Sequence, residues 1–366
     1  MSQKRFEEIR RYLHFNDNNA ALPKEHPDHD RVFKIRPLVD FLNAKFSSIP
    51  LERDLSIDEQ LWFSYKFELY TGQENQDKYR LIDEPDLMAS ANAVVRLSRI
   101  TPENNNYRLY FDNYYTTIPL ISYMASKGIQ TLGTVRRNRL PNCKFPSDKI
   151  LNKQPRGTAY EYITVFNDTP ITSVVWKDNK IVSLLSSYCG IQPIDTINRF
   201  DKKSKRVIKI DCPNIIKEYN RHMGGVDLLD SLIGRYKIKM RSKKWYIRIW
   251  YHLIDVAIVN AWILYRRVEM EHGRKATISL FDFRVEVAAS LTKVGEVITP
   301  KRGRPSSASS SQLLEKEIEL KRKKPHHNTM PPKNKSFIHL RFKNALDLMP
   351  FNPAEFKIVI EADRKP

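Results

Sequence analysis

The sequence predicts an α/β protein with helical segments at both ends, and three observations support this fold class. Apolar residues recur at helical spacing within residues 1–50, up to a Ser-Ser-Ile-Pro break. Residues 54–61 and 108–115 read as strands, and the second of these precedes a capped helix. Residues 129–210 carry further strand signals. The chain is therefore expected to fold around a sheet.

The composition favours an acidic polymer as partner. The 366 residues suffice for two or three domains, and 62 Lys and Arg against 42 Asp and Glu give a formal net charge of +20. No signal peptide is visible, and the longest apolar-rich segment, residues 256–264, is too short to span a bilayer, so nucleic acid is favoured over a membrane. Three scattered cysteines, Cys143, Cys189 and Cys212, indicate a reducing compartment rather than a disulfide framework or a zinc site.

The first predicted strand contains an acidic residue, which is unusual in a strand. Leu55, Ile57 and Leu61 share one face of this strand, and Asp58 lies on the other. Because acidic residues are depleted in strands, Asp58 is either an exposed strand position or a functional carboxylate. Residues 67–70 are a further strand candidate, and no turn residue separates them from Leu61.

A second acidic residue, Asp112, stands at the carboxyl end of the next strand. Ligands bind at this end of the strands in open α/β sheets, so Asp112 is either a ligand or the cap of a local turn. Thr116 or Thr117 is expected to cap a helix that runs to Met124, with Gly128 just beyond its end.

The β-rich stretch shows no catalytic constellation. It predicts a strand at residues 131–135 and a hairpin formed by residues 171–177 and 180–186, joined through Asp178-Asn179. Residues 144–157 are polar and are expected to form a loop. The arginine-rich residues 136–139 either contact phosphate or form a solvated turn.

The strongest chemical signal lies in residues 214–267. Asp227 and Asp230 are three residues apart at the start of a helical pattern, so both carboxylates can point at one place. A divalent cation binds carboxylates and a phosphate backbone binds cations, so the adjoining basic run suggests metal-assisted chemistry on nucleic acid. The cations of this run are Arg235, Lys237, Lys239, Arg241, Lys243, Lys244 and Arg248.

The composition changes after residue 298. Residues 301–305 read Lys-Arg-Gly-Arg-Pro, and a serine-rich stretch follows. Such a composition cannot bury enough apolar surface to order itself. Arg302 and Arg304 are spaced like a hook that inserts arginines into a narrow minor groove, and a solvated linker or a nuclear-import signal explains them as well.

Five short blocks of the sequence occur in a characteristic order. The blocks are residues 57–60 (Ile-Asp-Glu-Gln), 111–117 (Phe-Asp-Asn-Tyr-Tyr-Thr-Thr), 133–138 (Gly-Thr-Val-Arg-Arg-Asn), 176–179 (Trp-Lys-Asp-Asn) and 219–230 (Tyr-Asn-Arg-His-Met-Gly-Gly-Val-Asp-Leu-Leu-Asp). Together and in this order they resemble the piggyBac transposases and their domesticated derivatives. The resemblance implies an RNase H-like (DDE) catalytic core interrupted by a β-rich insertion, with a helical dimerisation and DNA-binding domain built from segments on both sides of that core.

The resemblance also implies roles for single residues. Asp58, Asp112 and Asp227 match the catalytic aspartates of the family, and Asp230 matches an additional acidic residue. These carboxylates would hold two Mg²⁺ ions, which activate the attacking oxygen and stabilise the leaving one in phosphodiester transfer. The relatives nick and join double-stranded DNA at TTAA targets, so the basic run would lie on the DNA path and anchor phosphates.

Three departures from the family pattern limit the expected activity. The chain begins inside the first helical domain of the family, and the C-terminal zinc-binding domain is absent, since residues 331–366 contain no cysteine. A block after the first aspartate is missing as well, so residues 55–71 read as one extended segment. That block is expected to supply a strand between the first and third strands of the sheet, and its loss would leave backbone groups unpaired at about 1–3 kcal/mol each.

The expected function is that of a nuclear, piggyBac transposable element-derived protein whose strand-transfer core is inactive or impaired. One alternative is a domesticated DNA-binding protein without catalysis, and another is a decaying or mis-spliced copy with no selected role. The family's dimerisation domain suggests a homodimer. The expected division of the chain is a first helical segment (1–53), a first core segment (54–137), a β-rich insertion (138–212), a second core segment (213–236), a second helical segment (237–298) and a basic disordered tail (299–366).

Overall fold

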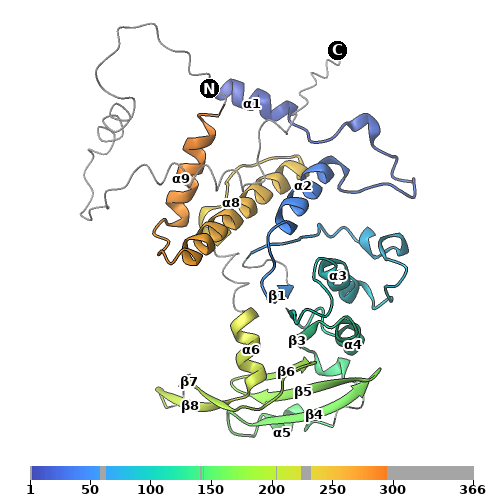
Figure 1. Cartoon of the computed structure of the whole chain (residues 1–366), viewed down its shortest axis with the longest axis vertical. Helices are drawn as coiled ribbons and strands as arrows, with labels where there is room; N and C mark the ends of the chain where they lie inside the picture. Colours follow the sequence, from blue (N-terminus) through green and yellow to red (C-terminus); the bar gives the residue numbers. More distant parts are fainter. Residues whose placement is uncertain are drawn as a thin grey trace, which may run out of the picture.

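The structure is a computed structural model that describes residues 2–57, 63–140, 142, 144–202, 204–223 and 232–294. A helical region lies at one end of the molecule, and a mixed β-sheet with a two-stranded ribbon lies at the other (Figure 1). The α-helices are α1 (Gln3–Tyr12), α2 (Arg36–Ser47), α3 (Ala89–Ser98), α4 (Ile118–Ser126), α5 (Asp148–Leu151), α6 (Asn214–Met223), α8 (Trp245–Glu271) and α9 (Leu280–Leu291). The strands are β1 (Asp54–Ile57), β2 (Arg108–Phe111), β3 (Gln130–Thr134), β4 (Ala159–Phe166), β5 (Thr169–Lys177), β6 (Ile181–Ser186), β7 (Asp195–Asp201) and β8 (Arg206–Cys212).

The main sheet has six strands in the order β1-β2-β3-β6-β5-β4. Strands β1, β2 and β3 are parallel to one another, and β6, β5 and β4 continue the sheet with antiparallel pairing. The α/β class predicted from the sequence is confirmed. The sequence suggested a division between core and insertion after residue 137. The sheet continues across this boundary, because β3 lies before it in the chain and pairs with β6, which lies after it.

The local predictions around α4 are confirmed. Thr117 is the N-cap of α4, and its side chain accepts a hydrogen bond from the Leu120 N–H. Gly128 follows the helix with φ of +69°, a conformation that favours glycine. The predicted hairpin is β5–β6, paired from Thr172–Ser186 to Lys177–Ile181. Residues 144–157, which were expected to be a loop, contain the short helix α5.

The expectation of unpaired backbone groups inside the sheet is wrong. β1 pairs directly with β2, with Asp54 opposite Arg108 and Ile57 opposite Phe111. β1 is therefore the edge of the sheet, and a further strand would add outside it. Within the described residues the sheet has no interior gap, so the expected cost of unpaired backbone groups in its interior does not arise.

The expectation of one extended segment over residues 55–71 is also wrong. Residues 63–71 form no strand, and Phe63 and Tyr65 are buried in the helical region instead. Backbone groups of this segment form hydrogen bonds with side chains. The Asn260 amide bonds both the N–H and the C=O of Ser64, and the Asn43 amide does the same for Phe67. Because helices α8 and α2 supply these partners, the segment has no need of a neighbouring strand.

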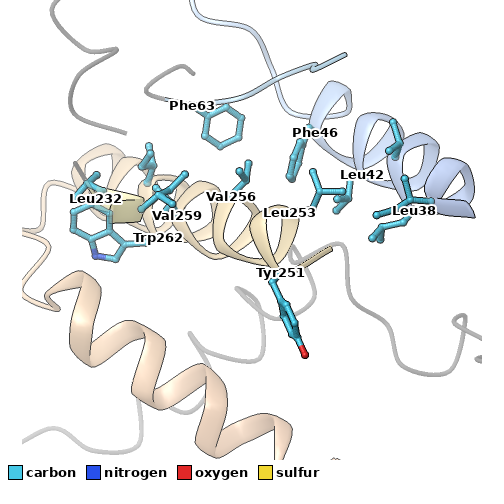
Figure 2. Packing of buried hydrophobic residues seen from close by; sticks show 14 of the residues in the cluster. Leu38, Leu42, Phe46, Phe63, Leu232, Tyr251, Leu253, Val256, Val259 and Trp262 are labelled. Atoms are coloured by element: carbon cyan, nitrogen blue, oxygen red, sulfur yellow. The ribbon is translucent and has the colours of Figure 1, made fainter. Parts of the chain in front are cut away.

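The helical region is organised around α8, whose apolar residues pack against α2 (Figure 2). By length and composition alone, α8 is long and apolar enough to cross a membrane, which corrects the sequence-based expectation that no segment was. Half of its most apolar window is buried in the protein, however, and three polar residues of α8, Asp255, Asn260 and Glu269, are buried as well. Each is hydrogen-bonded within the chain, as expected for the core helix of a folded domain.

Candidate functional site

The strand register brings together the positions that precede two predicted aspartates. Asp112 directly follows Phe111, the last residue of β2, and Phe111 is opposite Ile57, the last residue of β1. Neighbouring strands lie about 4.8 Å apart, so these two strand ends are adjacent. Asp58 follows Ile57 and lies outside the described residues.

Asp112 is half-buried and shapes the turn that follows β2. Its Oδ1 accepts a hydrogen bond of 2.7 Å from the Tyr114 N–H, and its carbonyl accepts one of 2.7 Å from the Thr116 hydroxyl. Asp112 therefore caps a local turn, which is one of the two roles that the sequence suggested. It also lines a cavity of about 480 Å³, between the open edge of β1 and residues 63–68, so the turn role leaves room for a ligand role.

The other two predicted aspartates, Asp227 and Asp230, also lie outside the described residues. The helix that leads to them, α6, packs on the sheet, where Ile215, Ile216 and Met223 join Tyr110 in one buried cluster. Among the residues that the structure describes, no group of three His, Cys, Asp or Glu side chains is placed to hold a metal ion. Of the four predicted carboxylates only Asp112 is described, and its oxygen donor suits a hard cation such as Mg²⁺.

The arginines of residues 136–139 hydrogen-bond and pair within the chain. Arg136 Nε donates to the Asn113 side chain at 2.9 Å. Arg139 Nη1 donates to the carbonyls of Asn113, Tyr114 and Thr116 at 2.8–3.2 Å. These contacts brace the turn that begins at Asp112. Arg137 pairs with Asp148 of α5.

A polar cluster beneath α6 was missed from the sequence. Tyr110 of β2 donates a hydrogen bond of 3.0 Å to Asp54 Oδ1 of β1, and Tyr188 donates one of 3.0 Å to the Tyr110 hydroxyl. The His222 ring of α6 stacks on the Tyr110 ring with centroids 4.5 Å apart. Burial raises the pKa of both tyrosines, so both hydroxyls remain protonated donors.

Opposite charges complete this cluster. His222 Nε2 lies 4.0 Å from Asp54 Oδ1 and 3.8 Å from Glu218 Oε2, and Arg108 Nη1 lies at the same two distances from the same two atoms. The cluster ties together β1, β2 and α6, the three elements that precede Asp58, Asp112 and Asp227. The i,i+4 spacing of Glu218 and His222 was its one sequence signal, and its partners come from distant strands.

The predicted basic run forms an exposed surface. It covers a short helix at residues 232–236, the loop at residues 237–244 and the first turn of α8. Its seven cations, Arg235, Lys237, Lys239, Arg241, Lys243, Lys244 and Arg248, are all exposed, and within the described stretches of the chain none forms an ion pair. Arg302 and Arg304 lie outside the described residues.

The N-terminal helix extends this basic surface. Lys244 Nζ donates to the Arg11 carbonyl of α1 at 2.6 Å. Lys34 and Lys244 both lie over the ring of Tyr246, at 5.4 and 5.9 Å from its centroid. The structure therefore gathers cations from three separate segments on one side of the helical region.

The comparisons with known proteins agree with this architecture. A family model described as "Transposase IS4" matches residues 1–66 and 62–262. The human PiggyBac transposable element-derived protein 3 is 29% identical over 341 residues, which cover 83% of this chain and 54% of that protein. The human PiggyBac transposable element-derived protein 2 is 31% identical over 291 residues, which cover 72% of this chain and 48% of that protein. The chain thus spans about half the length of these relatives.

A solved structure shares the fold. It is the cryo-EM structure of the piggyBac transposase synaptic complex with hairpin DNA, with a TM-score of 0.60 and 21% identity. The match covers 93% of this chain and 74% of that one. The family model, the relatives and the shared fold agree with the five sequence blocks. The chain belongs to the piggyBac transposase family.

Proposed function

We propose that this chain binds double-stranded DNA through the basic surface of residues 235–248 and retains a DDE-type core with impaired strand-transfer activity. The observation that carries the binding proposal is the set of seven exposed cations without ion-pair partners among the described residues. Cations that are not neutralised by the protein's own carboxylates are free to replace the counterions of phosphates. The piggyBac transposase of the shared fold was solved with hairpin DNA, which supports the same class of partner.

The core proposal is that β1, β2 and β3 belong to an RNase H-like sheet, with Asp58 and Asp112 directly after β1 and β2, and that Asp227 and Asp230, which follow α6 in the chain, complete the site. Its support is the parallel register that makes the ends of β1 and β2 neighbours. These carboxylates would hold two divalent ions. Carboxylate ligands suit Mg²⁺, and the two ions would supply the Lewis acidity for phosphodiester transfer. The six segments expected from the sequence remain our proposed division of the chain, and the proposal also includes nuclear localisation, a homodimer and TTAA targets.

Impaired activity follows from the edge position of β1. Only one neighbour, β2, pairs with it in the described sheet, so the carboxylate after β1 is positioned from one side. A loss of positioning on the order of 1 Å can lower a rate by about 10²-fold. DNA binding tolerates such looseness better, because phosphate contacts add up independently. A domesticated DNA-binding protein without catalysis is therefore the second candidate.

Duplex affinity over a range of salt concentrations tests the binding proposal. The double variant Lys243→Ala/Lys244→Ala should lose affinity and reduce the slope of log K against log salt by about 1.8, at about 0.9 for each phosphate contact. The matched control is Lys149→Ala/Lys153→Ala, which removes two exposed lysines of the α5 region. An affinity that ignores both salt and Lys243/Lys244 would refute the proposal.

Nicking of a TTAA-containing duplex with Mg²⁺ or Mn²⁺ separates the two candidates. Weak nicking that Asp112→Asn abolishes would establish a residual enzyme. Binding without nicking under any condition would leave the non-catalytic DNA-binding protein.

A further inference from the structure

The ribbon formed by β7 and β8 is a second candidate contact surface. The two strands pair over seven residues, from Asp195 opposite Cys212 to Asp201 opposite Arg206, and form a sheet of their own. Figure 1 shows them at the end of the molecule opposite α1 and α8.

The base of the ribbon is fixed to the body of the protein. Ile210 and Cys212 are buried with residues of the main sheet, and Trp176 Nε1 donates a hydrogen bond of 3.0 Å to the Asp211 carbonyl. Arg199 of β7 donates to Asp178 Oδ2 at 3.1 Å, beside Arg156 on the other oxygen of that carboxylate. These contacts fix the base of the ribbon on the body of the protein, so the ribbon is held in one orientation.

The tip carries cations that the described residues leave unneutralised. Lys202, Lys205, Arg206 and Lys209 are exposed and form no ion pair within the described stretches of the chain. The acidic residue at the tip, Asp201, accepts a hydrogen bond from the Ser204 N–H and lies 4.0 Å from Arg156. The tip therefore presents positive charge outward while its carboxylate turns to groups of the chain.

The outward face of the ribbon also carries an apolar pair. Phe200 and Val207 are opposite each other across the two strands and are 58% and 65% exposed. Inward positions of β8, such as Ile208 and Ile210, pack on the body instead. An exposed apolar pair flanked by cations suits a partner surface that has both phosphates and apolar groups.

We infer that the β7–β8 ribbon is a second DNA-contacting arm, with Lys202, Lys205, Arg206 and Lys209 on phosphates. A two-stranded ribbon fits the major groove of B-form DNA, where Phe200 and Val207 can meet thymine methyl groups. The inference rests on the proposed DNA-binding function and adds that one chain holds DNA at two separated places. A short duplex should therefore use only one of the two surfaces, and a long or second duplex is needed to use both.

The test compares the ribbon with the basic surface in the full chain. Duplexes of about 12 base pairs, roughly 40 Å, and several times that length are titrated over a range of salt. Lys202→Ala/Lys205→Ala should lose affinity for the long duplex and reduce its salt slope by about 1.8. The matched control Lys149→Ala/Lys153→Ala should change neither. Phe200→Ala should weaken binding, whereas Ile163→Ala, at an equally exposed position on β4, should not.

The possible outcomes distinguish the two proposals. If Lys243→Ala/Lys244→Ala weakens binding and the ribbon variants do not, the arm is refuted and the proposed function stands. If the unmodified chain binds no duplex, both are refuted. If the ribbon variants change binding to phosphatidylserine vesicles but not to DNA, the ribbon is a membrane contact and the inference is overturned.

Discussion

The hydroxyl of Tyr110 donates a hydrogen bond of 3.0 Å to the carboxylate of Asp54 and so joins β2 to the edge strand β1 by a side-chain contact. Asp54 lies four residues before Asp58 in the sequence, and Tyr110 lies two residues before Asp112. Because β1 has one strand neighbour in the described sheet, a side-chain tie of this kind contributes to holding the edge in register.

Tyr110→Phe should destabilise the fold. The change removes the hydrogen bond to Asp54 and leaves the hydroxyl of half-buried Tyr188 without its acceptor, at a cost of about 1–3 kcal/mol. The free energy of unfolding in urea measures the loss. Tyr162→Phe, at an exposed position on β4, is the matched control and should be nearly neutral. Equal stability of Tyr110→Phe and the unmodified chain would show that the tie contributes nothing.

His222 should make stability depend on pH near neutrality. Burial lowers its pKa from the ordinary value of 6.5, and this outweighs the carboxylates of Asp54 and Glu218, which raise it. The folded state therefore favours the neutral ring. Its contribution is complete above about pH 6.5 and is lost as pH falls from there through the folded pKa, at up to about 1.4 kcal/mol per pH unit.

His222→Phe keeps an aromatic ring on Tyr110 and removes the titration. The stability difference between the variant and the unmodified chain should therefore change between about pH 7 and pH 5. A difference that stays constant over this range would show that His222 has the same pKa in the folded and unfolded states, which would refute the prediction.

Gly133→Ala should be strongly unfavourable because β3 approaches β2 closely at this position. An added Cβ would lie 2.3 Å from Thr116 Oγ1 and 2.9 Å from the Phe111 carbonyl oxygen. We expect a loss of about 1–3 kcal/mol, since backbone and a buried side chain must move. Gly234→Ala is the control, because nothing lies within 4 Å of its added Cβ and alanine favours a helix by about 0.5–1 kcal/mol. Thermal unfolding of the two variants should therefore shift in opposite directions.

Asp255→Ala should destabilise the helical region and weaken DNA binding. Asp255 is fully buried, accepts a hydrogen bond of 2.7 Å from Arg284 and another of 3.0 Å from the Ile238 N–H of the basic loop. Its removal leaves Arg284 without its partner, at about 3–5 kcal/mol, and releases the loop. Unfolding in urea and duplex affinity measure the two effects.

The double variant Asp255→Leu/Arg284→Leu serves as the control. It removes both charges, so it should recover much of the stability that Asp255→Ala loses. It should not recover the DNA affinity, because the bond to Ile238 is still absent. Full recovery of affinity would mean that the loop is held by other contacts.

The amino-acid sequence alone determined the local features of this protein. The Thr117 cap, the left-handed Gly128 and the β5–β6 hairpin follow from residues close in sequence, because capping and turn chemistry act over a few residues. The basic run could also be recognised from the sequence, since the number of charged residues in a segment does not depend on folding. The five blocks also identified the family, and the comparisons confirmed it.

The tertiary structure decided the order of the strands and the contacts between distant segments. β1 lies beside β2 although about fifty residues separate them, and residues 63–71 join the helical region because Asn43 and Asn260 pair their backbone. The Tyr110 cluster draws on residues from Asp54 to His222. Such arrangements depend on which buried surfaces and polar groups satisfy one another across the whole fold, and no local pattern in the sequence encodes that choice.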